Sequence, residues 1–218
     1  MTPDYDAAAT KAYETLIAQN ITAAPVDPQP ILKRTPGVLL LSFAQMATLM
    51  GRDREDVLSA FSENQDAVTC TKLVDGKYQY VVAYNQMLPL YMVQRALARE
   101  LGHIMLGHDG TRTDEVRTAE AYCFAHHLLC PRPVIKALQD ANVRISVEVL
   151  GNVTGCYERC LSAIRKEPSV SVLPDLNRQL REQFESYINN YIAFQKTFAR
   201  DDDSALADFG CYMEGYEE

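Results

Sequence analysis

One short stretch of this 218-residue chain constrains the fold more than any other. Residues 67–74 and 77–84 are rich in threonine, valine and tyrosine, which suit a pleated sheet. They flank the dipeptide Asp75-Gly76, and Asp-Gly between two such runs is typical of a two-residue hairpin turn. The sequence therefore predicts a small antiparallel sheet over residues 67–84.

Helical patterns surround this hairpin on both sides. Two segments lie between the first two expected helices. They are a proline-containing break over residues 24–36 and an apolar run over residues 38–50, which Gly51 ends as a stop signal. The helices expected along the chain cover residues 7–20, 53–62, 89–106, 114–129, 133–141, 146–150, 154–166 and 175–199. The order of helices, sheet and helices predicts an α+β fold, mostly helical with a small antiparallel sheet.

The charge and the apolar runs exclude some classes of partner. The formal net charge is -8, so the chain as a whole does not attract nucleic-acid phosphates. No apolar run approaches the roughly 18 residues that cross a bilayer, and the first residues lack the basic and apolar regions of a signal peptide. We expect a cytoplasmic protein without a membrane partner, whose six cysteines are free thiols.

The stretch that points to chemistry is Arg-Glu-Leu-Gly-His at residues 99–103. Zinc peptidases use His-Glu-x-x-His on a helix, where two histidines one turn apart bind a metal ion and the glutamate activates the metal-bound water. Here Arg99 stands in place of the first histidine. A guanidinium is always charged and has no lone pair to donate, so it cannot replace an imidazole as a ligand.

The sequence around this motif resembles the ImmA/IrrE family of zinc metallopeptidases. Members carry His-Glu-Leu-Gly-His, followed by a helix with Glu-x-Glu-Ala-x-x-Phe-Ala-x-x-Leu-Leu-x-Pro. This chain has Leu-Gly-His at residues 106–108 and Glu-Ala-Tyr-Cys-Phe-Ala-His-His-Leu-Leu-Cys-Pro at residues 120–131. The resemblance covers residues 67–133 and implies a zincin-like metallopeptidase core with extra C-terminal helices.

The resemblance also assigns roles to single positions. Glu100 lies where the family has its catalytic general base, and His103 lies where it has the second histidine ligand. Arg99 departs from the pattern. The third ligand is an acid on the next helix, either at the position of Thr118, which would be a second departure, or at Glu120. Zinc is therefore an implied cofactor with an incomplete ligand set.

Two alternatives to a standard metal site remain open. Other ligand-type side chains could rebuild a site, although none lies at a family ligand position: His108, Glu115, Cys123, His126 and Cys130. The alternative that we favour is that Arg99 contacts Glu100 or Thr118 in place of a metal ion. His103 is then either a hydrogen-bonded histidine in a cleft or a residual ligand.

These observations favour one function and leave a second open. The first is a catalytically impaired family member that binds a protein partner such as a repressor, because the family's regulators cut repressors in mobile elements or stress responses. The second is an active zinc-dependent endopeptidase that cleaves a regulatory protein. A helix–turn–helix over residues 146–166 would offer nucleic-acid contacts, but the acidic chain favours a plain helical hairpin there.

The same resemblance suggests how the chain is divided. We expect a metallopeptidase-like domain over residues 1–135 and a C-terminal helical region over residues 136–199. After Arg200, residues 201–218 contain seven acidic residues and neither lysine nor arginine, which indicates an acidic tail over residues 200–218.

Overall fold

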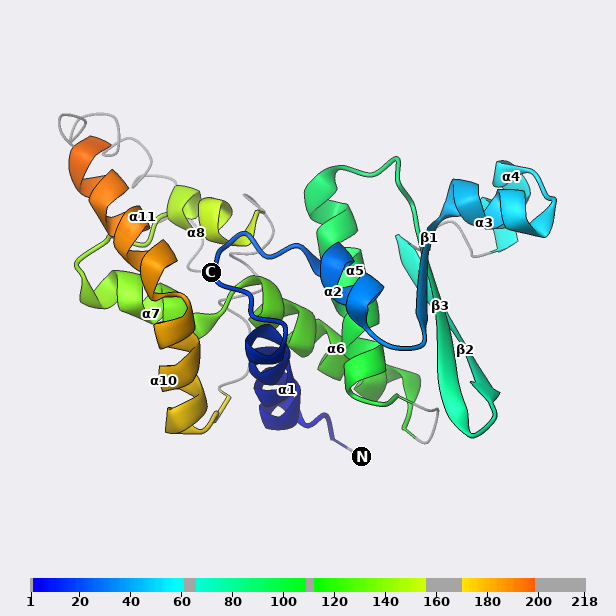
Figure 1. Ribbon diagram of the computed structural model, residues 1–218, viewed down its shortest axis with the longest axis horizontal. Coiled ribbons are helices and arrows are strands. Elements are labelled where there is room, and N and C mark those ends of the chain that lie inside the picture. Colours follow the sequence, from blue (N-terminus) through cyan, green and yellow to red (C-terminus); the bar gives the residue numbers. More distant parts are fainter. Residues whose placement is uncertain (1, 61–65, 109–111, 156–169, 199–218) are drawn as a thin grey trace, which may run out of the picture.

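The computed structural model describes residues 2–60, 66–108, 112–155 and 170–198. Its elements in chain order are α1 (Tyr5–Ala18), α2 (Pro28–Arg34), β1 (Val38–Ser42), α3 (Phe43–Met50), α4 (Arg54–Ala60), β2 (Ala67–Val74), β3 (Lys77–Tyr84), α5 (Leu90–Met105), α6 (Asp114–Leu129), α7 (Arg132–Asp140), α8 (Val147–Thr154), α10 (Pro174–Gln183) and α11 (Glu185–Phe198). Figure 1 shows the sheet at the right, α5 and α6 in the middle, and α7, α10 and α11 at the left.

The sheet contains the expected hairpin and one further strand. Strands β2 and β3 pair antiparallel across Asp75 and Gly76, both of which have positive φ, as a type I′ turn requires. Strand β1 pairs parallel to β3, from Val38 opposite Tyr80 to Ser42 opposite Tyr84, so the strand order is β1-β3-β2. The α+β class with mostly helical content is confirmed, but the sheet is mixed and not purely antiparallel.

The sequence pattern does not reveal β1 because strand and helix share one apolar run. Residues 38–50 form β1 and then α3 without a loop between them. Ser42 ends the strand and begins the helix: its hydroxyl accepts a hydrogen bond from the Gln45 N–H at 3.1 Å, and its own N–H donates to the Gln45 side-chain oxygen at 2.8 Å. This reciprocal pair is a capping box, which fixes the helix start.

Two other stretches differ from the helices expected from the sequence. The proline-containing break holds α2, which begins at Pro28 behind the capping side chain of Asp27, and a proline at the first helical position loses no hydrogen bond. The long helix expected over residues 175–199 is interrupted at Phe184, whose fully buried side chain lies between α10 and α11.

Several expectations fall wholly or partly outside the described residues. The second half of the helical hairpin over residues 146–166 and the acidic tail lie there, as do Cys156, Cys160 and Cys211. Among the cysteines that the structure describes, Cys70 is an exposed free thiol, as expected, and Cys123 and Cys130 are buried. The division of the chain at residue 135 stays a prediction.

The core is built around three helices that contact one another. Helix α6 packs against both α5 and α1, and one buried cluster joins them to α10 through Leu16, Leu101, Phe124 and Leu180. None of the helices in the described ranges is long and apolar enough to cross a membrane.

Helices α5 and α6 are in close contact at Gly102. A Cβ atom there would lie 3.0 Å from the ring of Phe124, 3.1 Å from the carbonyl oxygen of Ala121 and 3.2 Å from its Cα. Two of these neighbours are backbone atoms, so they cannot turn aside as a flexible side chain can. Glycine at position 102 therefore sets the spacing of the two helices.

We expect Gly102→Ala to lower the free energy of unfolding by about 1–2 kcal/mol, because the overpacking cost exceeds the gain in helix propensity. Chemical denaturation measures the change. Gly107→Ala is a useful comparison, because nothing lies within 4 Å of its Cβ position and only its positive φ is strained. An unchanged or higher stability for Gly102→Ala would contradict the close packing of α5 on α6.

Candidate functional site

Helix α5 carries the three residues that the sequence motif singles out. Glu100 is buried, while Arg99 and His103 are partly buried. Glu100 and His103 are three residues apart and therefore lie on one side of the helix. Helix α5 contacts both β2 and α6, so side chains on these two sides of the helix can reach both elements.

The Glu100 carboxylate has donors on both oxygens. Arg99 donates to Oε1 from Nη2 at 2.9 Å and from Nε at 3.1 Å. Thr69 on β2 donates its hydroxyl to Oε2 at 2.7 Å. The expected Arg99–Glu100 contact is therefore confirmed, with both guanidinium nitrogens donating to one carboxylate oxygen and the other oxygen left to Thr69.

Arg99 also joins the sheet to α6. Its Nη2 donates to the carbonyl oxygen of Ala67 at 3.2 Å, and its Nη1 lies 3.4 Å from the hydroxyl of Tyr122. The guanidinium carbon lies 5.8 Å from the centre of the Tyr122 ring, within the range of a cation–π contact. Burial alone would lower the pKa of Arg99, but Glu100 and Tyr122 together outweigh burial and raise this pKa above its usual value.

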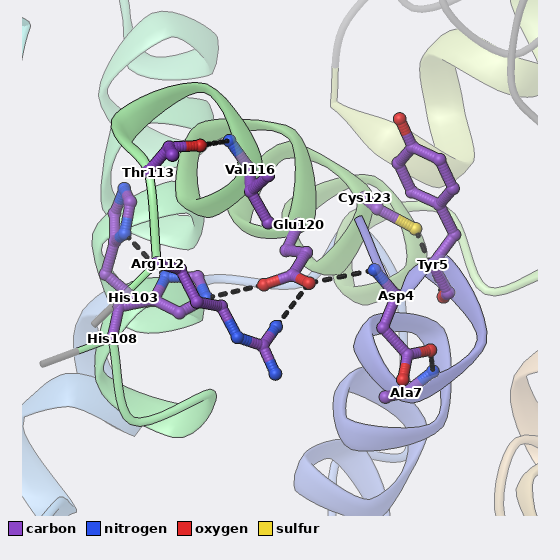
Figure 2. Close-up of polar contacts among 10 residues, drawn as sticks. All are labelled: Asp4, Tyr5, Ala7, His103, His108, Arg112, Thr113, Val116, Glu120 and Cys123. Atoms are coloured by element: carbon purple, nitrogen blue, oxygen red, sulfur yellow. Dashed lines mark hydrogen bonds and ion pairs between the residues drawn. The ribbon is translucent and has the colours of Figure 1, made fainter. Parts of the chain in front are cut away.

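A second chain of polar contacts runs from His103 through His108 to Glu120, as Figure 2 shows. His103 Nδ1 lies 2.8 Å from His108 Nδ1, and His108 Nε2 lies 3.0 Å from Glu120 Oε2. A carboxylate only accepts, so His108 donates from Nε2 and receives the His103 Nδ1–H on its other nitrogen. His103 then keeps a lone pair on Nε2.

The turn at the end of α5 brings His108 back to the helix. Gly107 has φ +63°, and the His108 N–H donates to the carbonyl oxygen of His103 at 3.1 Å. This is the Schellman arrangement that ends many helices, and glycine takes its left-handed position without strain. The backbone hydrogen bond and the contact between the two rings therefore depend on the same turn.

Glu120 is the most enclosed group of the site, with only 1% of its side chain exposed. Oε1 accepts the Asp4 backbone N–H at 2.8 Å and an ion pair from Arg112, while Oε2 accepts from His108. Arg112 directly precedes Thr113, whose hydroxyl caps α6 by accepting the Val116 N–H. Burial alone would raise the pKa of Glu120, but these hydrogen bonds hold it below its usual value.

The structure separates the two candidate positions for the third ligand. Glu120 lies in the site, whereas Thr118 is exposed and Arg99 contacts Glu100 rather than Thr118. Glu115, one of the side chains considered for a rebuilt site, is exposed as well.

Of the remaining side chains considered, only His108 joins the site. Cys123 donates to the carbonyl oxygen of Tyr5, and the ring of His126 lies beside that of His127, which contacts Tyr13. The sequence gives no signal for the contacts of Asp4 and Arg112 with Glu120, since Asp4 is 116 residues away and Arg112 belongs to no motif.

These donors and acceptors do not fit a catalytic zinc ion. Such an ion takes three protein ligands and leaves one position open. Arg99 offers no lone pair, and both oxygens of Glu120 already accept hydrogen bonds. Within the described ranges, no group of three or more histidine, cysteine, aspartate or glutamate side chains could hold a metal ion.

One comparison with known proteins gives a match. The model of a peptidase family, described as the IrrE N-terminal-like domain, matches residues 55–155. That span includes β2, β3, α5 and α6, and with them the positions of Arg99, Glu100, His103 and Glu120. No curated protein and no solved structure matches the chain.

The histidine pair predicts how stability depends on pH. Burial lowers the pKa of His103 to about 4, with smaller contributions from His108 and two nearby arginines, and burial also lowers the pKa of His108. Between pH 6.5 and about 4 the unfolded chain thus binds more protons than the folded protein. The free energy of unfolding should fall as the pH falls through this window.

Denaturant titrations of the wild type and of His103→Gln, at several pH values between 7 and 4, measure this dependence. In His103→Gln, the free energy of unfolding should depend less steeply on pH than in the wild type. The dependence that remains is the part that His108 contributes. Equal slopes for the two proteins would show that His103 is not held neutral by its surroundings.

Proposed function

Residues 55–155 of this chain form an IrrE N-terminal-like domain of the ImmA/IrrE metallopeptidase family, and from that premise we propose a function. The chain is a cytoplasmic regulatory protein whose zinc site is incomplete. It acts by binding a protein partner such as a repressor, and its capacity to cleave that partner is impaired.

The observation that carries this proposal is the Arg99–Glu100 ion pair. In a zinc peptidase the glutamate must accept a proton from the metal-bound water. Here Arg99 and Thr69 already donate three hydrogen bonds to Glu100, which leaves about one of the roughly four lone-pair sites of the carboxylate for a water molecule. Arg99 also brings a permanent positive charge to the position where the family has a metal ligand.

The surface beside this ion pair has the chemistry of a protein-binding site. Tyr122, which contacts Arg99, is 44% exposed, and tyrosine and arginine are enriched where proteins bind one another. At the other end of the hairpin, beside its turn, Leu73 and Tyr78 lie opposite each other and are 60% and 47% exposed. These apolar side chains offer contact area to a partner without any chemical step.

The alternative is an active zinc-dependent endopeptidase with a non-standard site. What favours it is that Glu100, His103 and Glu120 lie on two helices in contact, as in the family pattern. It would require Arg99 and Arg112 to leave their carboxylates when a metal ion binds.

Metal analysis separates the two functions. Protein purified without a chelator should contain far less than one zinc ion per chain, as measured by mass spectrometry of the metal. The reason is that Arg99 supplies no ligand and that Glu120 is already paired with Arg112, His108 and the Asp4 N–H. Glu100→Gln should give the same result, since it removes no ligand. Stoichiometric zinc in the wild type would remove the main support for the proposed function.

Partner binding is tested with a purified candidate repressor. We expect a complex of two intact chains by size-exclusion chromatography and intact-mass measurement, unaffected by chelator. Tyr122→Ala should weaken the complex about tenfold, as loss of an aromatic contact worth about 1.4 kcal/mol would. Tyr91→Ala, which removes a similarly exposed tyrosine from the start of α5 instead of from α6, should not weaken the complex.

The alternative function would be favoured if the wild type produces repressor fragments, and if these fragments are absent both when chelator is added and when Glu100→Gln replaces the wild type. Equal binding by the two tyrosine variants would show that the partner does not contact the surface next to Arg99.

A further inference from the structure

Two arginines form ion pairs with the two buried carboxylates of this site: Arg99 with Glu100, and Arg112 with Glu120. We infer that Arg99 and Arg112 together replace the two positive charges of a divalent ion, so that the site is closed to metal by two separate side chains. This rests on the proposed function and deepens it, because it says which residues exclude zinc.

The burial of the two carboxylates creates the need for cations. The side chains of Glu100 and Glu120 are 6% and 1% exposed. An ionised carboxylate out of water is costly unless it is paired and hydrogen-bonded. Arg99 pairs with Glu100 from the same helix, and Arg112 pairs with Glu120 from the residue before the α6 cap.

The charges of these four residues sum to zero. The contact between His103 Nδ1 and His108 Nδ1 needs one nitrogen without a proton, so at least one of these two rings is neutral. A divalent ion entering this site would create an excess of two positive charges next to two guanidinium groups. Coulomb repulsion in a partly buried site is strong, so both arginines must be displaced before the ion can bind.

Arg112 is the member of this pair that the sequence motif does not reveal. Restoring a histidine at position 99 would supply a second imidazole, but Glu120 would still be held by Arg112 and by the Asp4 N–H. Removal of Arg112 frees part of Glu120 Oε1, and the Asp4 N–H can share that oxygen or yield it. The third ligand thus depends on position 112.

The experiment compares zinc binding to four full-length proteins: wild type, Arg99→His, Arg112→Gln and the double variant. Binding is measured by competition with a chromophoric chelator, using Zn²⁺ alone as the probe. We expect no binding by the wild type, weak binding by either single variant, and binding by the double variant at least about tenfold tighter than by either. Zinc should also raise the melting temperature of the double variant most.

A remote arginine provides the matched control. Arg178 on α10 pairs with Asp175 at the surface, and Arg178→Gln changes the net charge by the same amount as Arg112→Gln. Combined with Arg99→His, it should leave zinc affinity at the level of Arg99→His alone. Circular dichroism melts of every variant confirm that it is folded.

Two results would overturn the inference. One is zinc affinity of Arg99→His equal to that of the double variant, which would leave Arg112 without a role. The other is a folded double variant that binds no zinc. Neither result bears on whether the wild type cleaves a repressor, which the intact-mass assay decides separately.

Discussion

The close contact between α5 and α6 at Gly102 is the constraint on which the site depends. With no side chain at this position, the backbone of α6 at Ala121 approaches α5 directly. Glu120, one residue before Ala121, is thereby held near the end of α5, where the turn at Gly107 returns His108 toward His103. One glycine sets the distance between the helices, and the other completes the polar chain between them.

Burial of charge explains why this polar chain is so fully connected. Glu100 and Glu120 each accept hydrogen bonds on both oxygens, from the sheet, from arginine side chains and from the N-terminal segment. Low local polarity strengthens such contacts and makes an unpaired group expensive. The network consequently joins β2, α5, α6 and the start of α1 around the residues that the sequence motif singles out.

Local signals in the sequence predict much of this structure, and long-range contacts account for what they miss. The Asp75-Gly76 hairpin, the bounds of α6 and the Arg99–Glu100 pair all follow from neighbouring residues. The parallel strand β1 does not, because its partner lies some forty residues away and its apolar run continues into α3. The contact between Asp4 and Glu120 is beyond any local pattern for the same reason.

The pairing of carboxylates with arginines also bears on how a retained motif residue is interpreted. Removing one partner of a buried ion pair costs about 3–5 kcal/mol, because the other charge is left unpaired. Arg99 is only 21% exposed, so Glu100 is needed for stability whether or not the chain cleaves anything, whereas Arg112 is 40% exposed and loses less when Glu120 is removed. Their presence in the family pattern is evidence of fold and descent, and the side chains around them, above all Arg99, determine the chemistry that remains.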